Sequence, residues 1–147
     1  MEIVKLFSYG ANMDISTLHQ RHIRYIDYRV GVLMDYQFKF NKASINRTHS
    51  FANIQYRKGA KVVGILSTIT INTLKLIDIY EGYPAHYNRI KLPIITDTDS
   101  VITANVYIGT SETLIEGLQP TNDYFEKIIR GRNLIRKLKL QVDFNFY

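Results

Sequence analysis

The feature that most constrains this chain is a set of strand-like segments in its first two thirds, which are not separated by regularly spaced helices. Apolar and polar residues alternate from Tyr36 to Phe40 and from Val101 to Ile108, as on strands with one buried face. The run from Val62 to Ile69 is β-branched and nearly continuous, as on a strand buried on both faces. Without regular βαβ alternation, the pattern predicts an α/β chain of the α+β type, a small, mixed, mostly antiparallel β-barrel with flanking helices.

Helix signals are fewer and lie mainly in the second half. Asp14 can cap a short helix after the first strand, and Asn72 can cap a second that Gly82 ends in the left-handed conformation. Pro120 and Thr121 precede a third helical segment that starts at Asp123. These helices are expected to pack outside the barrel.

Length and composition set broad limits. With 147 residues, 46% of them hydrophobic and 22% charged, the chain is expected to fold as one domain covering residues 1–147. The sequence shows no signal-peptide pattern and no apolar run long enough to cross a bilayer, so we expect a cytoplasmic location and no membrane partner. The absence of cysteine excludes disulfides, thiolate nucleophiles and cysteine metal sites.

The net charge of +6 raises the question of a nucleic-acid partner. Six basic residues fall between Lys127 and Lys139, but apolar residues recur among them, as in a helix or a helix and strand with one buried face. A solvated basic face is the favoured interpretation, a phosphate-binding face the alternative. The aromatic side chains that alternate along residues 36–40 are more simply interpreted as part of the hydrophobic core than as a platform on which nucleic-acid bases stack.

A sharp turn follows the first strand-like run, in the stretch Tyr9-Gly10-Ala11-Asn12. Glycine lets a ligand approach the backbone, and unpaired N–H groups between a strand end and a helix start bind carboxylates well. These residues therefore form a candidate site for an acidic small molecule. A tight turn without function is the alternative.

Glu81 has an unusual position for a charged residue. It lies at i+7 from Leu74 and at i+4 from Ile77, on the apolar stripe of the predicted helix and in its last turn. Partial burial and the negative end of the helix dipole both act to raise the pKa of a carboxyl group there. A carboxylate of that kind is a competent general base. Alternatively, Glu81 points to solvent from a fraying helix end.

Several motifs in the same order resemble the γ-glutamylcyclotransferases and their AIG2-like relatives. "FSYGANM" is similar to the family's strand and Tyr-Gly-Ser-Asn-Leu turn, "VGILSTI" to its Gly-Val-Leu-Tyr-x-Leu motif, and "LIDIYEGYPAHYNR" to its Leu-Asp-x-x-Glu-Gly motif with a following tyrosine. "FANIQ" resembles a further family strand. "QPTNDYFEKIIRG" resembles the helix that reads Pro-Ser-x-x-Tyr-x-x-x-Ile-x-x-Gly.

The resemblance implies a γ-glutamylcyclotransferase-like fold and activity. In that reaction the α-amine of a γ-glutamyl group attacks its own γ-carbonyl, which gives 5-oxoproline and releases the acylated amine. It implies that Glu81 is the catalytic general acid/base, that no cofactor or metal is needed, and that the partner is a small-molecule γ-glutamyl substrate. The substrate-binding residues implied are Phe7, Ser8, Tyr9, Gly10, Ala11, Asn12 and Tyr124.

This chain departs from the family pattern at three places. Ala11 stands where the family usually has serine, and the segment after Gly131 lacks the family's Glu-Asn-Gly-Leu-Pro sequence. Tyr80 and Tyr83, with Pro84, make the rim around Glu81 and Gly82 more aromatic than in the family. The alternative function is a non-catalytic binding protein of the same fold, with a basic C-terminal region for an acidic partner. A monomer and a homodimer both remain open.

Other site types have weaker support. His19 and His22 are three apart but lack a third metal ligand at a suggestive spacing, and no Gly-x-Ser-x-Gly elbow accompanies His49 or His86. We therefore expect neither a metal site nor a serine–histidine nucleophile.

Overall fold

The computed structural model describes the backbone of residues 2–146 and the side chains of residues 2–140. The elements in chain order are β1 (Ile3–Ser8), the 3-10 turn η1 (Ala11–Met13), α1 (Ile15–Gln20), β2 (Asp27–Ala43), β3 (Ser50–Thr70), α2 (Ile71–Glu81), β4 (Tyr87–Thr96), β5 (Val101–Gly109), the 3-10 turn η2 (Ser111–Thr113) and α3 (Asn122–Phe146). Among the described residues, no helix combines the length and apolarity needed to span a membrane.

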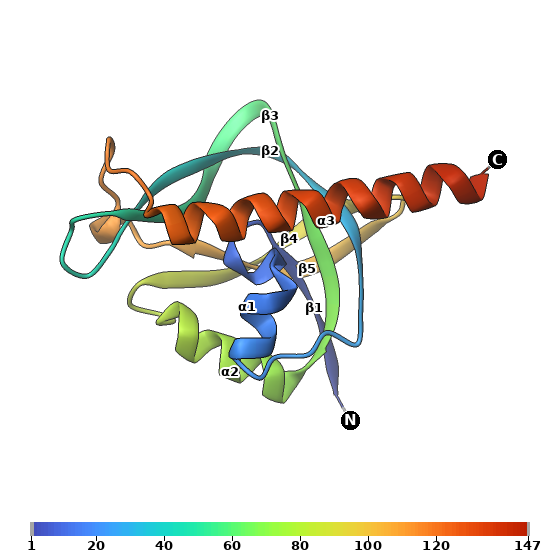
Figure 1. Ribbon diagram of the computed structural model, residues 1–147, viewed down its shortest axis with the longest axis horizontal. Helices are drawn as coiled ribbons and strands as arrows, with labels where there is room; N and C mark the ends of the chain where they lie inside the picture. Colours follow the sequence, from blue (N-terminus) through green and yellow to red (C-terminus); the bar gives the residue numbers. More distant parts are fainter. Residues whose placement is uncertain (1, 147) are drawn as a thin grey trace.

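The strands form a closed barrel in the order β1-β3-β2-β4-β5 (Figure 1). Neighbouring strands pair antiparallel except β1 and β5, which are parallel and close the barrel. The predicted mixed, mostly antiparallel barrel with flanking helices is therefore confirmed. The long β2–β3 pair changes register after Met34 and again after Lys39, which lets these two strands bend around the barrel.

Side chains on the two faces of the strands enter different hydrophobic clusters. Phe7, Leu66 and Ile94 belong to a cluster that fills the barrel. Leu6, which precedes Phe7 in sequence, and Ile69 on β3 instead pack outside the barrel, with apolar residues of α1 and α2. Some strands are buried on both faces because helices cover their outer face. This explains the continuous apolar run in β3.

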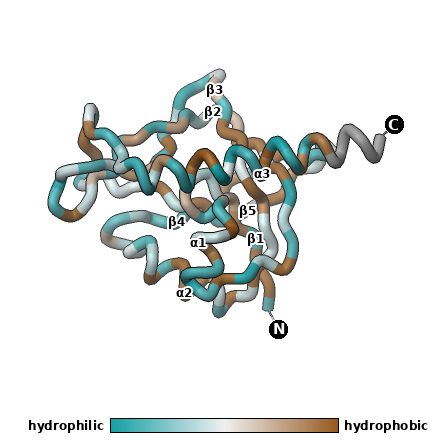
Figure 2. The backbone as a smooth tube through the Cα atoms, in the orientation of Figure 1, coloured by the Kyte–Doolittle hydropathy of each residue, from teal (hydrophilic) through white to brown (hydrophobic). Residues whose placement is uncertain are grey.

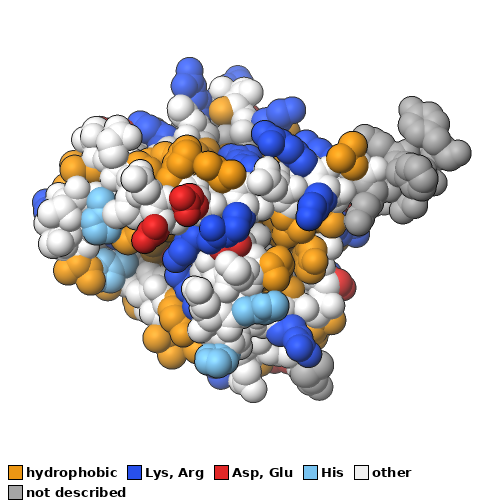
Figure 3. Space-filling view, in the orientation of Figure 1, with side chains coloured by type: hydrophobic (Ala, Val, Ile, Leu, Met, Phe, Trp, Pro, Cys, Tyr) orange, Lys and Arg blue, Asp and Glu red, His pale blue; other side chains and the backbone are white. Residues whose placement is uncertain are grey.

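Helix α3 crosses the front of the barrel in Figure 1. Ile135 packs with Met13 and Ile65 beneath the helix, while Arg136 and Lys137 are exposed. Hydrophobic and hydrophilic residues alternate along α3 in Figure 2, and Lys and Arg side chains gather along it in Figure 3. The prediction of one buried face is confirmed over residues 127–139, as a single helix rather than a helix and a strand.

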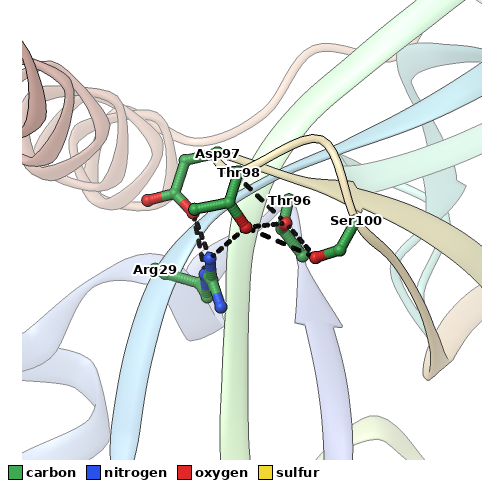
Figure 4. A network of polar contacts seen from close by, with 5 residues as sticks. All are labelled: Arg29, Thr96, Asp97, Thr98 and Ser100. Atoms are coloured by element: carbon green, nitrogen blue, oxygen red, sulfur yellow. Dashed lines mark hydrogen bonds and ion pairs between the residues drawn. The ribbon is translucent and has the colours of Figure 1, made fainter.

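The hydrogen-bonded pairing between β2 and β4 is short. Only Gly31 with Thr96 and Val32 with Ile95 are partners there. Next to this pairing, the turn after β4 is fastened to β2 by Arg29, whose guanidinium donates to Asp97 and to Thr98 (Figure 4). Hydroxyl contacts among Thr96, Thr98 and Ser100 complete this network. This polar network thus adds contacts between β2 and the turn after β4, where few backbone hydrogen bonds join β2 to β4.

Two of the predicted helix caps differ from the structure. Helix α2 is capped by Thr70, whose Oγ1 accepts from the backbone N–H of Thr73 at 3.1 Å, so the predicted cap at Asn72 is wrong. Asp14 does precede α1, but its carboxylate caps no backbone N–H. It accepts instead from the Arg130 guanidinium at 3.0 and 2.8 Å and from the Thr17 hydroxyl at 2.7 Å.

The Asp14–Arg130 ion pair joins α1 to α3. Asp14 is only 3% exposed, and burial acts to raise its pKa, but the hydrogen bonds from Arg130, Thr17 and Ser16 outweigh this and lower the pKa to about 2. The folded protein therefore holds this carboxylate in its charged form more strongly than the unfolded chain does.

We expect the Asp14→Asn variant to lose about 2 kcal/mol of folding free energy at neutral pH, because one pKa unit corresponds to about 1.4 kcal/mol. A depressed pKa gives stability that is present above pH ~4 and lost as the pH falls towards 2. The deficit of the variant should therefore shrink across that window in urea unfolding. Asp27→Asn, an exposed carboxylate on β2, is the control; equal losses in both variants would contradict the assignment.

Candidate functional site

A cavity of about 420 Å³ opens where the turn after β1 meets the end of α2. Its other walls come from β2, the start of β3, α3, Tyr87 of β4 and Tyr107 of β5. The predicted site residues all line it: Phe7, Ser8, Tyr9, Gly10, Ala11, Asn12, Glu81 and Tyr124. The structure thus brings together residues that lie more than 100 positions apart in sequence. Its size suits a small molecule.

The turn after β1 is a single 3-10 turn, and its geometry is fixed by packing against α3. Met13 N–H donates to the Gly10 carbonyl at 3.0 Å, and Met13 itself is buried against α3. Gly131 makes this contact possible, because a Cβ at that position would lie 2.6 Å from the Cβ of Met13. Among the described residues, the backbone N–H groups of Gly10 and Asn12 donate to no backbone carbonyl, which leaves them available to an acceptor in the cavity.

Glu81 is the last residue of α2, and its position follows from the helix pattern. Leu74 and Ile77 on the same stripe are 2% and 0% exposed, and Gly82 ends the helix in the left-handed conformation at φ 65°. The prediction of a glycine cap at Gly82 is confirmed. Glu81 faces the cavity rather than bulk solvent, so the alternative of a fraying, solvent-directed side chain is wrong.

A hydrogen-bond chain joins Glu81 to the turn after β1. Asn12 Nδ2 donates to Glu81 Oε1 at 2.8 Å, and Arg21 Nη1 donates to Asn12 Oδ1 at 3.1 Å. Asn12 is 6% exposed and is held further by Tyr25, whose hydroxyl donates to its backbone carbonyl at 2.7 Å. One carboxylate oxygen of Glu81 is therefore oriented by the protein, while its Oε2 has no hydrogen-bond partner among the described residues.

Burial raises the pKa of Glu81 above its ordinary value, although Arg21, the Asn12 hydrogen bond and Lys42 each act to lower it. Burial is the largest influence. Arg21 and Lys42 limit this rise, so the carboxylate can still ionise. A general base needs both a raised pKa and an accessible ionised form.

The phenols around the cavity are committed to structural hydrogen bonds. Tyr9 donates to the Tyr107 carbonyl at 2.6 Å, and Tyr87 donates to the Ala52 carbonyl at 2.8 Å. Tyr124 accepts from Ala52 N–H at 3.1 Å. Burial raises the pKa of Tyr9, Tyr87 and Tyr124 above the ordinary value, so these side chains stay neutral near pH 7. They shape and polarise the wall but do not compete with Glu81 as bases.

Several cavity residues were not found from the sequence. Lys42 is 3% exposed, and its ammonium donates to the Ala43 carbonyl at 2.8 Å and lies 5.4 Å from the centre of the Tyr87 ring. Lys42 lies two residues beyond the predicted alternation from Tyr36 to Phe40, and no sequence pattern indicated that it would be buried. Arg21 lies between His19 and His22, and the sequence pattern of this segment indicated only the spacing of the two histidines.

The alternative sites have little structural support. His19 and His22 are both exposed, on α1 and just beyond it. Within the described part of the chain, no three His, Asp or Glu side chains cluster in a way that could hold a metal ion. His86 lines the cavity, but no serine donates to it among the described residues.

Comparisons with known proteins identify the fold and the family. A family model described as "Gamma-glutamyl cyclotransferase, AIG2-like" matches residues 6–126. A structure titled "Gamma-glutamyl cyclotransferase" superposes with a TM-score of 0.74 at 23% identity, covering 94% of this chain and 87% of that one. No curated protein matches the sequence.

Two further structures have the same fold. An uncharacterized protein from Homo sapiens superposes with a TM-score of 0.76 at 23% identity, covering 95% of this chain and 88% of that one. A γ-glutamyl cyclotransferase from yeast, described as specific to glutathione, gives 0.69 at 9% identity, with 90% and 88% covered. At these identities the structures show a shared fold and nothing finer.

The contact between Gly131 and Met13 gives a test of how the site is held. We expect Gly131→Ala to destabilise the protein by about 1 to 2 kcal/mol, because the added methyl would push Met13 away and alanine's better helix propensity offsets only part of the strain. Asn133→Ala, exposed on the same helix, is the matched control and should change stability little. Urea unfolding measures both, and a stabilised Gly131→Ala variant would contradict this packing argument.

Proposed function

The chain belongs to the gamma-glutamyl cyclotransferase, AIG2-like family, and from that premise we propose that it cyclises the γ-glutamyl group of a γ-glutamyl amine or peptide to 5-oxoproline with release of the amine. The observation that carries the proposal is the contact between Asn12 and Glu81. It joins the turn after β1 to the one buried carboxylate of the cavity at 2.8 Å.

Glu81 is the proton carrier of the proposed reaction. The α-nitrogen of the substrate attacks the γ-carbonyl carbon and forms the new N–C bond of the five-membered ring. The bond between that carbon and the leaving nitrogen then breaks. Glu81 takes a proton from the α-nitrogen and gives it to the leaving nitrogen, so the carboxylate is regenerated and no further reactant is needed. Its Oε2 has the freedom for this, while Asn12 fixes its Oε1.

The remaining site residues hold the substrate in a folded conformation. In this proposal the backbone N–H groups of Gly10, Ala11 and Asn12 donate hydrogen bonds to the α-carboxylate and stabilise the developing oxyanion. Phe7, Ser8, Tyr9 and Tyr124 form the wall around the glutamyl chain. Because the nucleophile is part of the substrate, holding it folded supplies much of the acceleration through proximity.

Replacing Glu81 by glutamine tests the catalytic role. Glutamine keeps the volume and can still accept from Asn12, but it carries no base, so we expect turnover to fall by about 10² to 10⁴. Release of 5-oxoproline from a panel of γ-glutamyl compounds measures the rate, and calorimetry on the Glu81→Gln variant should show that substrate still binds. Glu112→Gln, exposed in η2 and outside this cavity, is the control. Full activity in Glu81→Gln would remove the proposal.

The pH profile gives an independent test. Since burial raises the pKa of Glu81 and the reaction requires its ionised form, kcat/KM should rise with pH through an apparent pKa above the ordinary glutamic acid value of about 4.3. The profile is measured with a substrate whose α-ammonium titrates well above that range. An acidic limb at or below the ordinary value would show that Glu81 is not the group titrating.

A further inference from the structure

The mouth of the cavity is lined by exposed apolar side chains. Ile45 is 87% exposed in the connection between β2 and β3, and Ile79 is 76% exposed near the end of α2. Tyr80, beside Ile79, is 47% exposed. All three line the cavity that holds Glu81, so two separate segments place apolar groups at one opening. Exposed apolar groups that converge on a pocket mark a surface that gains free energy when an apolar ligand covers it.

The charged residues around the cavity are mostly positive. Arg21, Lys42 and Lys127 line it against the single carboxylate of Glu81. Arg21 lies over the ring of Tyr80, with its guanidinium carbon 4.9 Å from the ring centre, so one cation belongs to the mouth itself. Lys42 lies deeper and is almost fully buried. A positive charge on the ligand, beyond the α-amine of its glutamyl group, would be repelled by these three cations, and solvent screens that repulsion poorly inside a cavity.

These two properties act on different parts of a γ-glutamyl compound. The glutamyl half is short and polar, and under the proposed function it lies between the turn after β1 and Glu81. The leaving half must then extend from the carbonyl beside Glu81 towards the mouth, where Ile45, Ile79 and Tyr80 are. The lining of the mouth therefore selects among leaving groups, while the interior recognises the glutamyl group that all such substrates share.

We propose that this site selects γ-glutamyl compounds whose leaving half has an apolar side chain and no positive charge, an apolar α-amino acid being the best match. The apolar side chain covers Ile45 and Ile79. The carboxylate of the amino acid faces the surrounding cations. Leaving halves that carry an ammonium group, such as polyamines or the side chain of lysine, are disfavoured. This inference rests on the proposed function and narrows its substrate class.

The experiment compares γ-glutamyl-norleucine with γ-glutamyl-lysine, each joined through the α-amine of the second residue. The two leaving halves share a carboxylate and a four-carbon side chain and differ in the terminal ammonium. We expect kcat/KM to favour norleucine by about tenfold or more, and γ-glutamyl-norleucine to exceed γ-glutamyl-glycine by about tenfold. Release of 5-oxoproline gives all three rates on one scale.

Variants assign each preference to its residues. Ile79→Ser should reduce the advantage of norleucine over glycine, because it removes apolar area at the mouth. Lys127→Glu should narrow the discrimination against lysine. Lys137→Glu makes the same change in net charge at an exposed position of α3 that does not line the cavity, so it should leave the discrimination unchanged.

The outcomes separate this inference from the proposed function. Release of 5-oxoproline from all compounds, with lysine equal to or faster than norleucine, would overturn the inference and leave the cyclisation intact. A norleucine preference that Ile79→Ser does not alter would equally overturn the role given to the mouth. Release from none of the compounds would remove the proposed function, and this inference with it.

Discussion

The hydrogen bond between Asn12 and Glu81 joins two segments that the barrel topology brings to one place from 69 positions apart in sequence. Neither residue could hold this geometry alone. Asn12 belongs to a single 3-10 turn, and Glu81 stands at a helix terminus, where side chains are usually free to fray. Asn12 is fixed because Arg21 and Tyr25 contact its side-chain and backbone oxygens, and Glu81 is fixed because its helix buries Leu74 and Ile77 beside the barrel. The site therefore depends on tertiary packing.

Helix α3 acts as the support for the turn that carries Asn12. It contacts that turn through Gly131, whose lack of a side chain admits Met13, and through Arg130, whose guanidinium holds the buried Asp14. Tyr124, from the first turns of the same helix, reaches the cavity and accepts from Ala52 of β3. One helix thus positions a wall of the cavity and the segment opposite Glu81. The charged surface of α3 is compatible with this structural role, because Arg136, Lys137 and Lys139 are exposed while Ile128 and Ile135 are buried.

Local patterns predicted what local physics determines. The glycine cap at Gly82 and the apolar stripe that carries Glu81 depend on spacing within one element, and the structure has both. The alternation from Val101 to Ile108 predicted one buried face, but residues 104–107 are buried on both faces, because Tyr107 on the outer face packs with Leu74 and Ile77 of α2. The predicted cap at Asn72 was wrong because the hydroxyl of Thr70, two residues earlier at the strand end, accepts the cap hydrogen bond instead. Asp14 holds the predicted N-cap position of α1, but its carboxylate binds Arg130, 116 positions away, and makes no cap hydrogen bond.

Lys42 shows the limit of sequence reasoning most clearly. A lysine on a strand normally points to solvent, yet Lys42, which follows a register shift in the β2–β3 pair, is almost fully buried. The apolar mouth was equally hidden, because Ile45 lies in a connection and Ile79 on the outer side of a helix, and only the barrel topology makes them neighbours of one cavity. The family motifs identified the glutamyl end of the site through residues 7–12 and Glu81. Ile79 and Tyr80 lie inside the motif around Glu81, but the motif does not show that they share an opening with Ile45.

The electrostatics of the cavity follow from these two ends. Burial raises the pKa of the Glu81 carboxyl and lowers the pKa of the Lys42 ammonium, because burial disfavours either charge. Placed in one cavity, each partly offsets the cost of the other, since Lys42 acts to lower the pKa of Glu81 and Glu81 acts to raise that of Lys42. With Arg21 added, the balance keeps Glu81 able to exchange a proton while the cavity as a whole stays positive. A base of raised pKa and a preference for uncharged or anionic ligands are therefore two consequences of one arrangement of charges.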